Sequence, residues 1–456
     1  MSYDAFLARK AVMDPMTGLD HVPDLPDCLF PHQRDIVAWA LRRGRAALFA
    51  GTGLGKSLME LAWAQQVHRH TGKPVLHLAP LAVSNQMVRE ADKFGIPAHI
   101  GDGDGICITN YQKLDHFDLS RFGAVILDES SILKNTDGHY RTRLIEACQS
   151  IPFRLAATAT PAPNDFMELG NHAEFLGVMR YTDMLATFFV HDGGETQKWR
   201  LKGHAENEFW KWMASWAVML RKPSDLGYRN DGYDLPALHY HMHNVAVEYA
   251  PSMETGTLFP MQAATLQERI AARRDTVSQR VAMAASITPM DRPFVWWCNL
   301  NSEAEALAKA IPCSVNLHGG LKDDDKERIL VDFSEGRIRH LISKASIAGF
   351  GMNWQHCADT GFVGLNDSFE QFYQAIRRFW RFGQTQEVNC HIVAAETEGA
   401  TVANIRRKEA DAERMAAAMV MHMADLSSKA VRGMVRDTPN YNPTIPVQLP
   451  SFVRAA

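Results

Sequence analysis

One segment, AGTGLGKS (50–57), combines the glycines, the lysine and the hydroxyl residue that bind phosphate. It follows an apolar segment, RAALFA (45–50), which we expect to form a buried strand, and it opens an amphipathic helix expected at 57–70. At such a junction, backbone N–H groups and the positive end of the helix dipole face the same anion. We therefore interpret the segment as a P-loop that binds ATP, in preference to a glycine-rich turn without a ligand.

The polar positions of this loop have separate expected roles. Gly53 and Gly55 allow backbone N–H groups to wrap the β-phosphate. Lys56 reaches the β- and γ-phosphates, and the Ser57 hydroxyl ligates Mg²⁺. Ala50 stands where the strict pattern has its first glycine, a change that leaves the phosphate-binding positions intact. ATP and Mg²⁺ are the expected cofactors.

A second acidic site follows in AVILDES (124–130). Four apolar residues predict a buried strand, and Asp128 and Glu129 emerge from its end. Asp128 is expected to hold Mg²⁺, and Glu129 to orient and deprotonate the attacking water. A carboxylate base beside the metal predicts hydrolysis of ATP, because a kinase needs a site for a second acceptor instead.

Strand-like and helix-like segments alternate in two blocks, which predicts an α/β fold with parallel sheets covered on both faces. The first block spans residues 24–170, and the second begins near Leu238. The expected strands are 45–50, 74–80, 105–110, 124–129 and 154–160 in the first block, and 294–300, 314–318, 340–345, 360–366 and 388–394 in the second.

Composition places few limits on function. The chain of 456 residues is 46% hydrophobic and 22% charged, an ordinary globular balance. No apolar run approaches the roughly 18–20 residues that a membrane helix needs, and the N-terminus lacks a signal-peptide pattern. Seven cysteines without CxxC spacing predict reduced thiols and a cytoplasmic location. The net charge of −4 does not by itself indicate a nucleic-acid partner. A groove that binds nucleic acid nevertheless needs only local positive charge.

The order of further motifs resembles that of superfamily 2 helicases, related to the DEAD/DEAH-box proteins, and specifically their Swi/Snf-like branch. LFPHQRDIVAWAL (29–41) resembles the adenine-recognising segment, with Gln33 as the implied reader. LDESSILKN (127–135) is similar to the extended second motif of that branch, with Ser131 where the family usually has histidine. ATATPAPND (157–165) resembles the third motif, whose Thr158 and Thr160 would couple hydrolysis to lobe movement.

The second block continues the resemblance. LHGGLKDDDKERILVDFSEG (317–336) is similar to the helix-entry segment of the second lobe. KASIAGFGMN (344–353) resembles motif five, with Gly349, Gly351 and Asn353 in register, and the two glycines are implied to lie at the nucleotide.

QAIRRFWRFGQ (374–384) resembles motif six. The resemblance implies that Arg378 and Arg381 are arginine fingers that reach the γ-phosphate. Arg377 replaces an aspartate that is usual in the branch.

The resemblance covers roughly residues 28–415 and implies two RecA-like lobes, in a compact form like that of bacteriophage and prophage helicases. The expected domains are a first ATP-binding lobe (1–170), a helical insert and lobe connector (171–237), and a second lobe (238–415). The end of a long Ala/Met-rich helix expected at 403–431 and a Pro-rich tail then form 416–456.

Several residues also fit structural roles. The arginines of motif six fit a solvated basic helix face, because their spacing places them on one side. HYHMH (239–243) has a metal-capable geometry, but no carboxylate or cysteine cluster accompanies it, so an exposed strand face is favoured. Four tryptophans fit either base stacking or the core of the insert, and we expect the core. Lys344 and Arg89 fit phosphate-backbone contacts or ordinary surface charges equally. The tryptophans are Trp199, Trp210, Trp212 and Trp216.

The leading prediction is therefore a nucleic-acid-stimulated ATPase that steps along DNA, most simply along the duplex. A helicase that separates strands of DNA or RNA is the first alternative, since the shared motifs encode lobe closure rather than a strand-splitting wedge. An ATP-gated clamp without turnover is a second alternative. A nucleotide kinase would explain the first block, but it would not account for the motifs of the second block. No membrane partner is expected.

Overall fold

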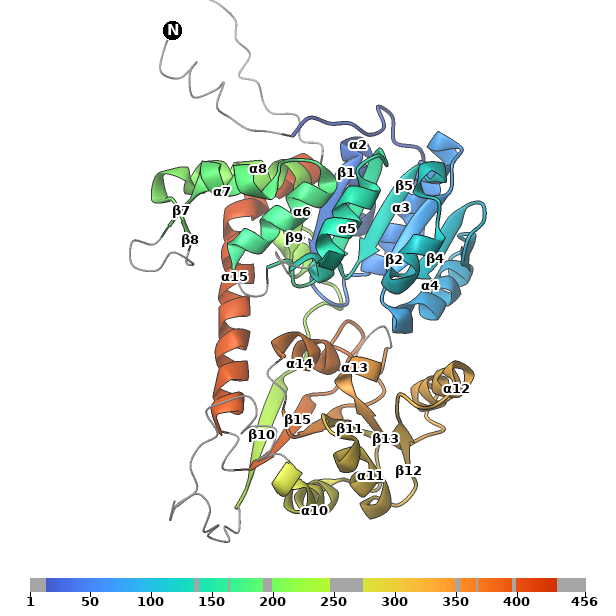
Figure 1. Cartoon of the computed structure of the whole chain (residues 1–456), viewed down its shortest axis with the longest axis vertical. Helices are drawn as coiled ribbons and strands as arrows, with labels where there is room; N and C mark the ends of the chain where they lie inside the picture. The colour runs from blue at the N-terminus through green and yellow to red at the C-terminus, as the bar shows by residue number, and fades with distance from the viewer. Residues whose placement is uncertain are drawn as a thin grey trace, which may run out of the picture.

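The computed structural model describes residues 14–134, 139–162, 165–191, 199–246, 274–348, 353–365, 368–395 and 399–432. Two parallel sheets, each with helices packed against it, form two lobes that lie one above the other in Figure 1. This confirms the predicted α/β fold with two RecA-like lobes.

The first lobe contains a seven-stranded sheet in the order β3-β4-β2-β5-β6-β1-β9, with all neighbouring strands parallel. The central strands are buried along their whole length, as expected when helices cover both faces. The strands are β1 (Arg45–Ala50), β2 (Val75–Ala79), β3 (Ala98–Ile100), β4 (Ile106–Asn110), β5 (Ala124–Asp128), β6 (Phe153–Thr158) and β9 (Ala217–Leu220).

Two hydrophobic cores form on opposite faces of this sheet, because successive side chains of a strand point to opposite sides. In β1, Ala46 and Leu48 belong to one core, and Ala47 and Phe49 belong to the other. The helices of the first core are α2 (Pro31–Arg43), α3 (Lys56–Thr71) and α4 (Leu81–Lys93), and those of the second are α5 (His139–Cys148), α6 (Leu169–Leu176), α7 (Tyr181–Phe188) and α8 (Glu206–Trp216).

The Trp-rich segment packs into the second of these cores. Trp210, Trp212 and Trp216 of α8 are buried there, and Trp199, in the short hairpin of β7 (Phe189–His191) and β8 (Trp199–Leu201), packs against them. The prediction that the tryptophans form a core is confirmed for the described residues. Residues 217–220, which fall within the expected insert and connector, are buried as strand β9, parallel to β1.

The second lobe contains a six-stranded parallel sheet in the order β10-β15-β14-β11-β13-β12. Its strands are β10 (Leu238–Val245), β11 (Phe294–Cys298), β12 (Ser314–Leu317), β13 (His340–Lys344), β14 (Asp359–Val363) and β15 (Val388–Ala395). Its helices are α10 (Val277–Ile287), α11 (Asn301–Ala310), α12 (Asp323–Ser334), α13 (Ala345–Ala348) and α14 (Phe369–Ile376).

The histidines of HYHMH lie along β10 at the edge of this sheet. His239 bonds Glu387, His241 bonds Asn389, and His243 shares a 3.0 Å hydrogen bond with His391. Among the residues that the structure describes, no three or more His, Cys, Asp or Glu side chains come together as a metal-binding cluster. The strand-face interpretation therefore accounts for them.

A single long helix, α15 (Gly399–Val431), runs beside both lobes (Figure 1). Near its start, Ile405 lies in the core of the second lobe. Farther along, Met419 and Met423 lie in a core of the first lobe, and Ser428 donates a 3.1 Å hydrogen bond to the Leu226 carbonyl. The expected domain boundary at 415 thus falls inside a continuous helix that ties the lobes together.

A fully buried ion pair joins α10 to α11 in the second lobe. Arg280 Nη1 lies 2.6 Å from Glu303 Oε1, and both side chains are inaccessible to solvent. Glu303 Oε2 accepts hydrogen bonds from the backbone N–H groups of Asn299 and Leu300, at 2.9 and 2.8 Å. The carboxylate is therefore satisfied on both oxygens, and it holds the loop that follows β11.

Replacing Glu303 by alanine should lower the free energy of unfolding of the second lobe by about 3–5 kcal/mol, because buried Arg280 loses the carboxylate at 2.6 Å and two backbone N–H groups lose their acceptor. Hydrogen exchange of β11 and β14 amides at increasing urea concentration measures this locally. Arg328→Ala, which breaks an exposed pair with Asp325, is the matched control and should change stability by less than about 1 kcal/mol. Equal effects of the two substitutions would contradict the structural role of Glu303.

Candidate functional site

A cavity of about 100 Å³ lies between the lobes and is lined by residues of both. This volume is small beside the roughly 300–1,000 Å³ of typical ligand pockets, and it suits a phosphate group better than a whole nucleotide. Most of the residues predicted from the sequence meet here. The lining includes Gly53, Gly55, Lys56, Ser57, Asp128, Glu129, Arg378 and Arg381.

A larger cavity, of about 640 Å³, lies between the lobes beside α15. It reaches Thr52 and Leu54, but Lys56, Asp128 and Glu129 do not line it. The charges required for phosphate chemistry therefore gather in the smaller cavity.

The loop before α3 needs glycine at two positions. Gly53 and Gly55 have φ angles of 90° and 76°, in the left-handed region that disfavours other residues. A Cβ atom at Gly53 would lie 2.9 Å from the backbone nitrogen of Phe382 in the second lobe. The Lys56 ammonium donates a 3.0 Å hydrogen bond to the Ala50 carbonyl and is thus held inside the loop.

Gln33 lies directly against this loop and is only 2% exposed. Its Nε2 donates to the Leu54 carbonyl at 2.9 Å, and its Oε1 accepts from the Phe30 backbone N–H at 3.0 Å. A Cβ atom on Gly55 would lie 2.2 Å from Gln33 Nε2, so the second glycine is required for this close approach. Gln33 therefore contacts the loop backbone through its amide nitrogen, while its amide oxygen caps the start of α2.

Three aromatic rings cluster beside Gln33, and the sequence did not predict their association. Tyr233 and Phe382 have ring centroids 4.5 Å apart, and Phe30 lies 6.2 and 6.1 Å from them. The three residues come from the start of the chain, the segment between the sheets and motif six. No spacing rule could connect positions so distant in sequence.

Asp128 and Glu129 leave the end of β5 in different backbone conformations. Glu129 has a φ of 53°, which is uncommon for a residue other than glycine and costs roughly 1–3 kcal/mol. Its Oε2 accepts a hydrogen bond from Thr158 Oγ1 at 3.3 Å, and the Thr160 backbone N–H donates to Thr158 Oγ1 at 3.1 Å. The third-motif threonines are therefore connected directly to the Glu129 carboxylate.

Burial raises the pKa of Asp128 well above its usual value, and the nearby carboxylates Glu60 and Glu129 raise it further. His77 and Lys56 act in the opposite direction. A buried carboxylate of this kind gains most from a cation placed at its oxygens. The donor set of Asp128 and the Ser57 hydroxyl therefore fits Mg²⁺, which prefers oxygen ligands.

Behind Asp128 lies a buried pair that the sequence did not reveal. Glu60 Oε2 is 2.9 Å from His77 Nε2, and neither side chain reaches solvent. Burial raises the pKa of Glu60 to about 8 and lowers the pKa of His77 to about 4. Burial therefore favours the uncharged form of both groups.

Of the two motif-six arginines at the lobe interface, Arg378 is buried and Arg381 is half-buried. Burial lowers the pKa of Arg378 to about 9, against the attraction of Glu129 and Asp128, and lowers the pKa of Arg381 to about 10, against that of Glu90. Both values lie above neutral pH, so both guanidinium groups keep their charge. The alternative of a solvated basic helix face is wrong for these two residues. Arg377, by contrast, stacks on Tyr373 and Trp380.

Four polar atoms lining the smaller cavity are buried without a hydrogen-bond partner within the described part of the chain. They are Thr52 Oγ1, Gln86 Oε1, Gln374 Nε2 and Arg381 Nε. Buried polar atoms normally have partners, so these atoms indicate a polar ligand. The donors among them, together with Lys56 and Arg378, fit the oxygens of a triphosphate.

Some predicted positions lie outside the described residues, namely Gly349, Gly351 and Asn135. Asn353, from the same motif as the two glycines, lines the smaller cavity. Arg89 pairs with Glu327 of α12 at 3.0 Å, so in this structure it contacts the other lobe.

Residues 290–383 match the family described as the helicase conserved C-terminal domain. The matched region runs from the residues before β11 to the end of motif six, and it contains both arginines. This domain supports a helicase-type, ATP-dependent nucleic-acid motor of superfamily 1 or 2. No curated protein sequence matches the chain. In the described part of the chain, no helix is both long and apolar enough to cross a bilayer.

Proposed function

We propose that this protein hydrolyses ATP between its two lobes and uses the cycle to move along duplex DNA. The observation that carries the proposal is the cavity to which the first lobe contributes Lys56, Asp128 and Glu129 and the second contributes Arg378 and Arg381. A phosphate-binding loop on one side and buried cations on the other are useful only if the lobes act together.

The first lobe would bind and prepare the triphosphate. Lys56 and the backbone between Gly53 and Gly55 take the phosphates, and Ser57 with Asp128 hold Mg²⁺. When bound, Mg²⁺ neutralises charge on the β- and γ-phosphate oxygens. Gln33 and the aromatic cluster beside it would contact the adenine base attached to those phosphates. The second N–H of Gln33 Nε2 would donate a hydrogen bond to the base.

The remaining groups would act during hydrolysis. Glu129, held by Thr158, orients the water and accepts its proton. Arg378 and Arg381 stabilise the negative charge that develops on the transferred group. Gly349 and Gly351 are proposed to complete the nucleotide site from the second lobe.

Movement follows from the division of these groups between lobes. Nucleic acid that spans both lobes changes how closely they approach, and so controls whether the arginines reach the phosphates. Duplex DNA is favoured over a separated strand because the resemblance is to the Swi/Snf-like branch. Strand separation by a DNA or RNA helicase remains the competing proposal, since the same cavity serves it equally.

Lys56→Ala and Glu129→Gln should both abolish ATP turnover, by different routes. Loss of Lys56 removes positive charge from the phosphates, so ATP binding weakens. Loss of the Glu129 carboxylate leaves binding intact but removes the group that prepares the water. Titration with a fluorescent ATP analogue measures binding, and steady-state kinetics measures turnover. Together they distinguish the binding defect of Lys56→Ala from the catalytic defect of Glu129→Gln. Turnover by Glu129→Gln within a few-fold of wild type would refute its assignment as base.

Arg378→Ala or Arg381→Ala should reduce nucleic-acid-stimulated turnover by roughly 10³-fold and leave ATP affinity nearly unchanged, because an arginine finger acts mainly in the transition state. The exposed Arg328→Ala in the same lobe is the control for loss of a positive charge. Normal stimulated turnover in both finger variants would rule out this role.

Duplex DNA should stimulate the ATPase more than single-stranded DNA or RNA, and binding should weaken steeply with salt because phosphate contacts dominate it. A triplex-displacement assay reports movement along intact duplex, and a forked-duplex assay reports unwinding. We expect displacement without unwinding. Robust unwinding without displacement would favour the helicase alternative, and stimulation by RNA alone would exclude the duplex-DNA translocase.

A further inference from the structure

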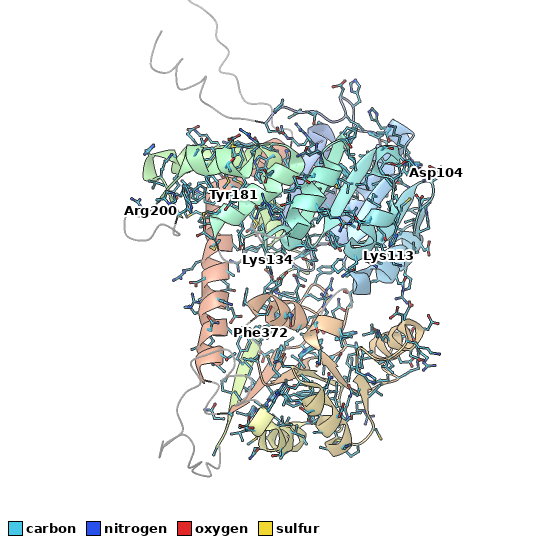
Figure 2. All side chains as sticks on the ribbon, in the orientation of Figure 1. Asp104, Lys113, Lys134, Tyr181, Arg200 and Phe372 are labelled. Carbon is cyan, nitrogen blue, oxygen red and sulfur yellow. The ribbon has the colours of Figure 1, made fainter. Side chains whose placement is uncertain are left out.

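A side-chain contact across the lobe interface connects the turn after Glu129 to the helix that leads to the arginines. Ser131 Oγ donates a 2.8 Å hydrogen bond to Glu370 Oε1, and the Lys134 ammonium pairs with Glu370 Oε2. Ser131 and Lys134 belong to the short 3-10 helix η3 (Ser130–Lys134), and Glu370 lies in the first turn of α14. Figure 2 shows Lys134 between the two lobes.

The first-lobe side of this contact is held firmly in place. His172 of α6 lies 3.1 Å from Ser130 Oγ through its Nε2 atom, and both residues are buried. Asn171 Nδ2 donates to the Lys134 carbonyl at 3.4 Å. Since η3 follows Glu129 directly, the position of η3 and that of the Glu129 carboxylate are linked through the backbone.

The second-lobe side is equally direct. Glu370 and Gln374 are spaced four residues apart along one face of α14 (Phe369–Ile376), and Arg378 follows in the turn directly after the helix. Gln374 and Arg378 both line the smaller cavity, and Arg378 Nη2 donates to Gln374 Oε1 at 3.4 Å. An anchor at Glu370 therefore sets how far this face, and with it Arg378, projects toward the first lobe.

The contact is better shielded from water than the Arg89–Glu327 ion pair, which also joins the lobes. The side chains of Lys134 and Glu370 are 29% and 21% exposed, whereas those of Arg89 and Glu327 are 47% and 38% exposed. Shielded, hydrogen-bonded charge pairs are stronger and more exacting in geometry than exposed ones. Ser131 and Lys134 also follow Glu129 closely in the chain, within η3, whereas Glu327 lies on α12.

We propose that Glu370 is a positioning residue that couples closure of the lobes to ATP hydrolysis. Its carboxylate receives Ser131 and Lys134 only when the lobes are together, and in that arrangement α14 delivers Arg378 to the cavity. Glu370 does not touch the reacting atoms, and it acts through the helix and through η3. The inference rests on the proposed function and adds to it a specific contact that forms only when the lobes close.

Glu370→Ala should lower kcat at saturating duplex DNA by roughly 10- to 100-fold, because a small displacement of a catalytic group has effects of that size. The KM for ATP should stay within about two-fold of wild type, since Lys56 and the glycine loop are untouched. Glu370→Gln can still accept a hydrogen bond from Ser131 but loses the charge pair. Its kcat should therefore fall between those of the wild type and Glu370→Ala. An unchanged KM would show that the ATP-binding groups remain in place, and the charge-reversal pair below distinguishes loss of the contact from a smaller folded fraction.

Exchanging the charges of residues 134 and 370 tests whether the ion pair itself is what matters. Lys134→Glu and Glu370→Lys should each be impaired, and the double variant should recover most of the lost kcat because the pair is restored in reverse. Glu327→Ala is the matched control, since it removes a carboxylate from the exposed inter-lobe pair, and it should change kcat by less than about two-fold. Full activity of Glu370→Ala, or additive losses in the double variant, would overturn the proposal.

A second readout keeps this test separate from the proposed function. Small-angle scattering of the wild type and of Glu370→Ala compares lobe separation without any turnover. A larger radius of gyration in Glu370→Ala, but not in Glu327→Ala, supports the contact as the one that holds the lobes together. Identical radii in all three proteins would contradict it. A wild type that hydrolyses no ATP on any nucleic acid would refute the proposed function, and the scattering result would still decide the contact.

Discussion

Arg378 and Arg381 of the second lobe face carboxylates of the first lobe across the lobe interface, and the rest of the structure depends on this opposition of charge. Removing a guanidinium group from water costs several kcal/mol unless negative charge compensates it. Asp128 and Glu129 provide that compensation for Arg378, and Glu90 provides it for Arg381. The balance is incomplete, because polar atoms of the cavity still have no partner in the described part of the chain. A triphosphate with Mg²⁺ has the charge and the oxygens to complete it, so nucleotide binding and lobe closure favour each other.

The fold serves this interface in two ways. In the large sheet of each lobe all the strands are parallel, so the loops that follow them gather at one edge, and these edges carry the residues of the smaller cavity. The ends of β1, β5 and β6 supply the phosphate loop, the acidic pair and the threonines. The long helix α15 then joins the lobes on a different side, with its start in one core and its later turns in another. Because α15 contacts both lobes, the lobes can move toward each other while they stay connected. Such a connection suits a motor that opens and closes repeatedly.

Much of this arrangement could be predicted from the sequence, because local patterns encode it. Apolar segments followed by small or polar residues predicted the central strands, and the glycines with Lys56 predicted the loop before α3. Strand β9 was assigned to the connector, since only its pairing with β1 distinguishes four apolar residues from a linker. The Glu60–His77 pair, the aromatic cluster of Tyr233 and Phe382, and the contact of Ser131 with Glu370 arise from tertiary proximity alone. No spacing in one sequence reports such contacts, and the substitution of Ser131 for a histidine became interpretable only beside its partner.

The account can be tested most directly by a crystal or cryo-electron microscopy structure of the protein with duplex DNA, ADP, Mg²⁺ and aluminium fluoride. The fluoride complex occupies the position of the transferred phosphoryl group. We predict that guanidinium nitrogens of Arg378 and Arg381 lie within about 3 Å of its fluorine atoms, at hydrogen-bonding distance, while Lys56 contacts the same group from the first lobe. A complex in which both arginines stay beyond hydrogen-bonding distance, with the lobes closed on DNA, would contradict the claim that hydrolysis is shared between the lobes.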